Sequence, residues 1–153
     1  MSKTNCLIII ILFSISCSVS NERKIEEYII QDLDFNMKKQ DNLYIVFSMN
    51  SCQDCLVRTK KILLQNINNY KDETTLNIVV SGNSKRSINL FLGQKLRQKS
   101  NIIYDLKNSL INKSFFKNGY FYFLLYKNQN VEQFFKFNNF DNYPKFEESM
   151  QSF

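Results

Sequence analysis

The sequence contains no histidine and no tryptophan, and only one proline and three glycines among its 153 residues. Histidine is the commonest general base and the commonest metal ligand in proteins. Hydrolases that depend on a Ser-His or Cys-His pair are therefore excluded, because their base is missing. Cysteine, aspartate, glutamate, lysine and tyrosine remain as the side chains that could carry out chemistry.

The length of the chain fits a single domain. Hydrophobic residues make up 44% of the sequence, which is enough to build the packed core of an α/β or α+β domain. The formal net charge is +6, but the basic residues are spread along the chain and mixed with acidic ones, as on a solvated surface. Because no DNA- or RNA-binding motif accompanies them, the sequence predicts no nucleic-acid partner.

Residues 1–16 have the pattern of a secretory signal peptide. Lys3 supplies the positive start, Leu7–Phe13 is an unbroken apolar run, and small residues follow it. The apolar run is shorter than the roughly 20 residues that span a membrane. The stretch FSISC, which ends at Cys17, resembles the cleavage motif of bacterial lipoproteins, although Ser14 stands where leucine is usual.

The lipoprotein resemblance implies that the chain is cut before Cys17, whose sulfur then carries a diacylglycerol. Two or more acyl chains keep a protein stably on a membrane. Ser18 in place of aspartate after that cysteine favours the outer membrane under Gram-negative sorting. We therefore expect a lipid-anchored protein of the bacterial cell envelope, on the periplasmic face or the outer membrane. A plain secreted protein and an uncleaved membrane anchor are the alternatives.

The mature chain would keep one unmodified pair of cysteines, Cys52 and Cys55. Cys6 lies in the leader and would be discarded, and Cys17 would be lipidated. Disulfides persist in exported compartments, so the pair could be a redox couple, half of a metal site or a structural disulfide. Zinc needs four ligands, usually cysteine and histidine. Since this chain offers two cysteines and no histidine, we expect no metal and no other cofactor.

Hydrophobic periodicity predicts an α/β domain over residues 41–153, preceded by a tether or N-terminal extension over residues 17–40. Residues 21–41 are polar but carry apolar side chains at near-helical spacing, and they could form either a helix or an edge strand. Short apolar runs and amphipathic repeats predict the remaining elements. These are strands at 43–47 and 76–80, helices at 52–68 and 84–98, a short strand at 101–105, a short helix at 106–116, a hairpin of strands at 120–126 and 131–137, and a terminal helix with Tyr143, Phe146 and Met150 on one face.

Cys52 and Cys55 lie at the start of the first predicted helix of this domain. Ser51 fits the N-cap of that helix, and Asp54 three residues later completes a capping-box pattern. A cysteine in the first turn of a helix meets the positive end of the helix dipole and free N–H groups, which favour the thiolate. The strand–helix–strand unit that contains the pair predicts parallel pairing of its strands.

A C-x-x-C pair that opens the helix after the first strand of such a unit, with a hairpin further on, resembles the thioredoxin fold. Together with its leader, the chain is similar to exported, membrane-tethered thiol-disulfide oxidoreductases of the TlpA type over roughly residues 40–153. The resemblance implies a three-layer α/β fold whose central mixed sheet is flanked by helices. It also implies that Cys52 is the nucleophile that attacks a partner's disulfide and that Cys55 is the resolving thiol. The implied partners are protein thiols or disulfides, an upstream redox partner and, through the lipid anchor, the membrane.

The chain departs from the family pattern in three places. The residues MNS at 49–51 stand where an aromatic residue, often tryptophan, usually precedes the first cysteine. The spacer is Gln53-Asp54, and a carboxylate there opposes a neighbouring thiolate. The family's cis-proline loop aligns with Gly119 and Tyr120, where a cis bond costs about 2 kcal/mol more than before proline. We expect this substrate-binding loop to be trans or remodelled.

These departures support an alternative within the same fold. The chain could be a non-catalytic binding or accessory lipoprotein, in which Cys52 and Cys55 form only a structural disulfide. The sequence predicts where the pair lies. The two interpretations differ in whether the pair carries out thiol-disulfide exchange.

Overall fold

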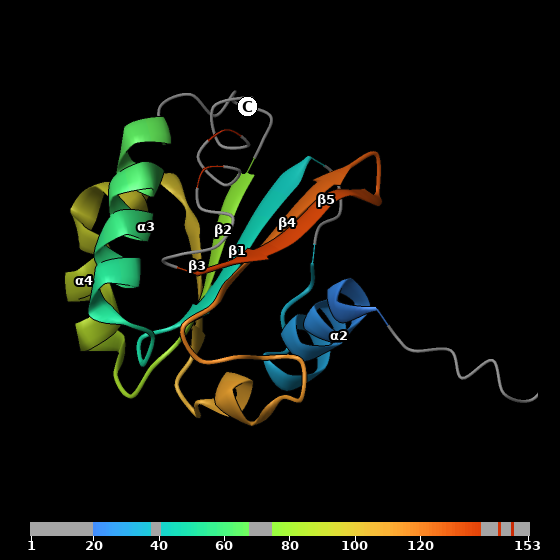
Figure 1. The fold of residues 1–153 in the computed structure, drawn as a ribbon, viewed down its shortest axis with the longest axis horizontal. Coiled ribbons are helices and arrows are strands. Elements are labelled where there is room, and N and C mark those ends of the chain that lie inside the picture. The colour runs from blue at the N-terminus through green and yellow to red at the C-terminus, as the bar shows by residue number, and fades with distance from the viewer. Residues whose placement is uncertain (1–19, 38–40, 68–74, 139–143, 145–147, 149–153) are drawn as a thin grey trace, which may run out of the picture.

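The computed structural model of the chain describes residues 20–37, 41–67, 75–138, 144 and 148. Within these residues a five-stranded sheet forms the middle layer, and helices cover both of its faces (Figure 1). The chain therefore has the layered α/β fold that the sequence predicts.

Three parallel strands joined by helices form one half of the sheet. In chain order these elements are β1 at Asn42–Ser48, α3 at Gln53–Asn66, β2 at Thr75–Ser81, α4 at Lys85–Lys99 and β3 at Asn101–Asp105. β2 pairs in parallel with β1 on one side and with β3 on the other. The predicted strand–helix–strand unit and its parallel pairing are confirmed.

A hairpin forms the other half of the sheet. β4 at Phe121–Lys127 lies between β1 and β5 at Asn130–Phe137, and it pairs antiparallel with both. Asn128 and Gln129 join the two strands with positive φ angles of 49° and 67°, as tight hairpin turns require. β4 is buried along all but its last residue, as expected for an internal strand. The strand order of the mixed sheet is β3-β2-β1-β4-β5.

A hydrophobic cluster packs on each face of the sheet. Alternate residues of a strand face opposite sides, so Ile45 and Phe47 of β1 join the cluster beneath α3 and α4. Tyr44 and Val46 join the cluster on the other face. A strand–helix–strand unit followed by a hairpin, with helices on both faces, is the thioredoxin-like α/β architecture that the sequence resemblance implies.

The N-terminal part of the described chain is helical. α2 at Asn21–Glu27 continues into a π-helix, η1, at Tyr28–Asp32. Ile25, Tyr28 and Ile29 are buried in the cluster on the face opposite α3 and α4 (Figure 1). The sequence left a helix or an edge strand open for residues 21–41. The structure has the helix. Part of the segment expected as a tether or N-terminal extension packs against the sheet.

The predicted short helix over residues 106–116 is wrong. This stretch contains turns and only one 3-10 helix, η2 at Ser109–Asn112. Asn108 directly before it is in the left-handed region, with φ 54° and ψ 32°, which interrupts a right-handed helix. The Asp105 carboxylate accepts the N–H groups of Ser109 and Leu110, so local hydrogen bonds replace those of a longer helix.

Several expectations concern residues outside the described part of the chain. The terminal helix around Tyr143, Phe146 and Met150 is one of them, and the leader with Cys6 and Cys17 is another. Within the described ranges, no helix is long and apolar enough to cross a membrane.

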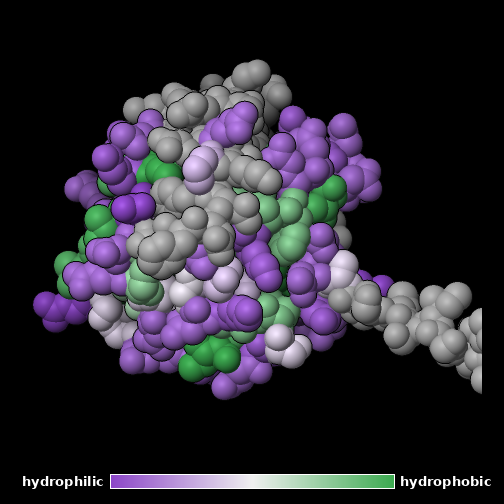
Figure 2. Space-filling model, in the orientation of Figure 1, coloured by the Kyte–Doolittle hydropathy of each residue, from purple (hydrophilic) through white to green (hydrophobic). Residues whose placement is uncertain are grey.

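Among the residues that the structure describes, the exposed large apolar side chains lie on separate segments. They are Ile30, Val57, Leu90, Leu106 and Ile111. Figure 2 accordingly shows hydrophobic residues as small patches among hydrophilic ones on the face in view. The disulfide between Cys52 and Cys55 is the most distinctive chemical feature of the described residues.

Candidate redox site

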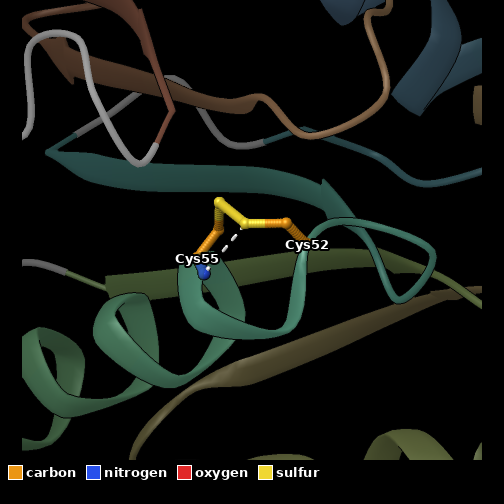
Figure 3. The surroundings of a disulfide bond; sticks show 2 residues. All are labelled: Cys52 and Cys55. Atoms are coloured by element: carbon orange, nitrogen blue, oxygen red, sulfur yellow. Dashed lines mark hydrogen bonds between the residues drawn. A yellow bond between two sulfur atoms is a disulfide. The ribbon is translucent and has the colours of Figure 1, made fainter.

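Cys52 and Cys55 form a disulfide at the first turn of α3 (Figure 3). Their Cα atoms lie 5.3 Å apart, within the range that a disulfide spans. Two links position the preceding loop: the N–H of Met49 donates to the carbonyl of Ser81 on β2, and the N–H of Asn50 donates to Ser48 Oγ. The end of β1 and the neighbouring strand thus fix where the helix begins.

Cys52 itself is the N-cap of α3. Its φ and ψ angles are −58° and 139°, and its Sγ accepts the N–H of Cys55 at 3.2 Å. The first helical hydrogen bond runs from the N–H of Leu56 to the carbonyl of Cys52 at 3.1 Å. One sulfur therefore belongs to the disulfide and also satisfies an N–H at the positive end of the helix dipole.

The predicted cap at Ser51, with Asp54 completing a capping box, is wrong. The N–H of Ser51 donates to the carbonyl of Ser48 at 3.0 Å, which closes a tight turn one residue before the helix. That turn buries Ser51, which is 7% exposed, and leaves the cap position to Cys52. Asp54 remains exposed in the first turn of α3.

The two cysteines differ sharply in exposure. Cys52 is exposed, whereas Cys55 is 2% exposed and belongs to the cluster between α3 and the sheet. Attack on a partner needs an accessible sulfur, and resolution of a mixed disulfide needs a second sulfur close behind the first. The arrangement is compatible with the expected roles of Cys52 as nucleophile and Cys55 as resolving thiol.

Gly82, at the end of β2, leaves room for the loop that leads into the pair. A Cβ atom on Gly82 would lie 3.0 Å from Cγ of Met49, which is closer than packed carbon atoms approach. The Met49 side chain therefore lies close against the backbone of Gly82. A larger residue at position 82 would require the Met49 side chain to move.

Two hydroxyl groups beside the pair were missed by sequence reasoning. Ser51 Oγ and Thr59 Oγ1 are buried, and neither has a hydrogen-bond partner among the described residues. The signal for Thr59 is present in the sequence, because a polar residue four positions after Cys55 falls on the apolar stripe of the helix.

Gly119 and Tyr120 lie in the loop before β4. The described residues contain no cis peptide bond, and Gly119 has φ 87°, a conformation that favours glycine. The half-buried ring of Tyr120 packs against the cluster on the α2 face. Lys117 and Lys136 place their Nζ atoms 5.9 and 5.6 Å from its centroid. The expected trans geometry is therefore present in this loop.

A buried carboxylate lies at the same edge of the sheet, at the end of β3. Asp105 is 2% exposed. Its Oδ2 accepts the hydroxyl of Tyr28 at 2.9 Å and the N–H of Leu110 at 2.8 Å, and its Oδ1 accepts the N–H of Ser109 at 3.0 Å. Burial acts to raise the pKa of Asp105, but these hydrogen bonds outweigh it and lower the pKa below the ordinary value. The carboxylate therefore stays ionised and ties η1 to η2.

The basic residues that follow the pair differ in their surroundings. Arg58 and Lys61 are exposed, and Lys60 places its Nζ 5.5 Å from the ring centroid of Phe91 on α4. In the described part of the chain, no group of three or more cysteine, aspartate or glutamate side chains could bind a metal ion. The chemistry of the site therefore rests on the two sulfurs and their immediate neighbours.

Comparison with known proteins returns no family model that matches the chain. No curated protein matches it either. The fold and the site define a thioredoxin-like α/β domain with a C-x-x-C disulfide at the start of α3, the helix that follows β1.

Proposed function

We propose that this protein is an exported, lipid-anchored thiol-disulfide exchange protein related to the TlpA type. The observation that carries the proposal is the Cys52–Cys55 disulfide at the start of α3, with one exposed and one buried cysteine. A structural disulfide gains nothing from exposing one partner, whereas exchange requires it.

The proposed exchange proceeds through a mixed disulfide. In the reduced protein the Cys52 thiolate attacks one sulfur of a partner's disulfide, and the partner's other sulfur leaves as a thiolate that takes up a proton. Cys55 then loses its proton and attacks Cys52 Sγ, which releases the second partner sulfur. Two electrons pass from this pair to the partner, and the reverse sequence oxidises a partner dithiol. An upstream thiol-disulfide partner returns the pair to its starting state.

The test of exchange is to trap the mixed disulfide. In cells that express the full-length chain, Cys55→Ala removes the resolving sulfur, so we expect partner adducts to accumulate on Cys52. Non-reducing electrophoresis and mass spectrometry would detect these adducts, and dithiothreitol would release them. The matched control is the double variant Cys52→Ala/Cys55→Ala, which also lacks the disulfide but offers no nucleophile at position 52. Adducts absent from Cys55→Ala, or equally abundant in the control, would contradict the exchange function.

A second candidate function is a non-catalytic binding or accessory lipoprotein of the same fold. The observation that favours it is the loop at Gly119 and Tyr120, where all peptide bonds are trans and no proline faces the pair. In that case Cys52→Ser would leave the cellular phenotype of the intact protein unchanged, whereas exchange requires that the variant behave like a deletion.

A further inference from the structure

The two buried hydroxyl groups without partners among the described residues lie close to the cysteine pair in the sequence. Among the described residues, Ser51 Oγ and Thr59 Oγ1 are the buried side-chain nitrogen or oxygen atoms that make no hydrogen bond. Ser51 is 7% exposed and Thr59 is 1% exposed. Ser51 directly precedes Cys52, and Thr59 lies four residues after Cys55 on the buried side of α3.

Other buried polar side chains at this edge of the sheet do have partners. Ser48 Oγ accepts the N–H of Asn50, Ser81 donates its hydroxyl to Asn108, and Asp105 accepts several donors. Native proteins seldom leave a buried hydroxyl unsatisfied, because the group has lost its hydrogen bonds to water. Two such groups within one helical turn of a disulfide therefore need an explanation that concerns the disulfide.

The redox state of the sulfurs provides that explanation. A sulfur in a disulfide is a weak hydrogen-bond acceptor, whereas a thiolate is a charged acceptor that strengthens any hydrogen bond it receives. Residues four apart on a helix lie on the same face, which places the Thr59 side chain beside that of Cys55. Ser51 is joined directly to Cys52 and is buried.

We propose that Ser51 and Thr59 are positioning residues whose hydroxyls donate hydrogen bonds to the sulfurs of Cys52 and Cys55 once the disulfide is reduced. This inference rests on the proposed exchange function and adds a direction to it. The hydroxyls lose free energy in the oxidised state and regain it in the reduced state, so they favour the reduced pair.

The consequence is a pair that accepts electrons more readily. Reduction by a partner dithiol breaks the Cys52–Cys55 bond, forms a disulfide in the partner, and transfers two electrons to this pair. Each of the two protons that the partner releases goes to a sulfur of this pair or, where that sulfur stays a thiolate, to solvent. Stabilising the reduced form of a dithiol–disulfide couple makes it a stronger oxidant. The substrate class favoured by the two hydroxyls is therefore the reduced dithiol of an exported protein.

The experiment measures the reduction potential of the full-length protein, purified in detergent and equilibrated in glutathione buffers of graded ratio. Alkylation and mass spectrometry give the reduced fraction. Thr59→Val and Ser51→Ala each remove one hydroxyl. We expect each to raise the equilibrium constant for disulfide formation about tenfold, which makes the potential about 30 mV more negative.

Hydroxyl-retaining variants and a hydroxyl that already has a hydrogen-bond partner serve as controls. Thr59→Ser and Ser51→Thr keep the donor, and we expect potentials close to that of the wild type. Ser81→Ala removes a buried hydroxyl that already has a partner, so it should lower stability and leave the potential unchanged. Circular dichroism of each variant verifies that it is folded.

Unchanged potentials in folded Thr59→Val and Ser51→Ala would overturn the inference. In that case the hydroxyls would be hydrogen-bonded to buried water, or to the helix backbone after a small relaxation. An equal shift in Ser81→Ala would also overturn it, because the effect would then follow from stability alone. The measurement needs no natural partner. A shifted potential combined with no trapped adduct in Cys55→Ala would refute the exchange function and leave this inference intact. Trapped adducts combined with an unchanged potential would support the exchange function and refute this inference.

Discussion

Buried polar side chains at the carboxyl edge of the parallel strands fall into two groups. Ser81 and Asp105 have hydrogen-bond partners that join loops and helices to the sheet. Among the described residues, the hydroxyls of Ser51 and Thr59 have none. At the scale of single residues, the first group joins segments of the fold, whereas the second group is the one that we propose to be satisfied when the neighbouring disulfide is reduced.

Asp105→Asn tests the contribution of the first group to stability. The amide keeps the size of the carboxylate but places N–H groups against the donors from Tyr28, Ser109 and Leu110. We expect the free energy of unfolding to fall by about 2–4 kcal/mol in urea denaturation at neutral pH. Asp54→Asn, which changes an exposed carboxylate, should stay within about 0.5 kcal/mol of the wild type. A loss no larger than that of Asp54→Asn would show that the Asp105 network contributes little.

Acid should weaken the same network in the wild type. The pKa of Asp105 in the folded protein lies below its ordinary value of 3.8. A carboxyl group whose pKa is depressed by folding stabilises the protein fully above the unfolded pKa, and this contribution is lost as the pH falls through the folded pKa. We expect urea midpoints to decline below about pH 4 in the wild type and to decline less in Asp105→Asn. Parallel declines would contradict the assignment.

At the scale of elements, the sequence predicts the sheet well because strand burial follows local patterns. The apolar run at 43–47 and the run at 76–80, which only Asn77 interrupts, indicate strands buried on both faces, and the structure places them side by side in the sheet. The start of α3 is harder to predict, because the turn from Ser51 to Ser48 and the register against β2 depend on tertiary contacts. The partnerless hydroxyls are likewise invisible in sequence, since their lack of partners is a property of the packed helix.

The kink inside α4 is another feature that helical periodicity does not predict. Gly93 has φ 76° and ψ 175° in the middle of this helix, a region of backbone conformation that is essentially restricted to glycine. A Cβ atom there would meet only Lys60 Nζ, at 3.9 Å, so the cost of a side chain is conformational rather than steric. We expect Gly93→Ala to destabilise the protein by about 1–3 kcal/mol, measured by urea denaturation.

The neighbouring exposed residue provides the control for this prediction. Gln94→Ala replaces a side chain on the same part of α4 without changing a special backbone conformation, and it should be nearly neutral. If Gly93→Ala were as stable as Gln94→Ala, α4 would be a continuous helix at this position.

At the scale of the whole molecule, the N-terminal helix and the cysteine pair belong to opposite layers. α2 packs on one face of the sheet, and α3, which carries the disulfide, packs on the other (Figure 1). Only three residues separate Cys17 from the first residue of α2, a distance of about 14 Å when fully extended. A lipid on Cys17 would thus keep α2 close to the membrane surface.

Cys17→Ser tests this arrangement in cells that express the full-length protein. The variant lacks the sulfur that would carry the diacylglycerol, and a chain without two or more acyl groups is not stably anchored. We expect the wild type to sediment with membranes and to incorporate labelled palmitate, and the variant to lose the label. Cys6→Ser is the matched control, because that cysteine lies in the leader and its loss should leave both properties unchanged.

Two other outcomes would contradict the lipid anchor. A Cys17→Ser variant that remains in the membrane without label would identify an uncleaved anchor, and a wild type found in the soluble fraction would identify a plain secreted protein. Either result would remove the anchor from the proposed function and leave the chemistry of the cysteine pair to be judged by the trapping experiment.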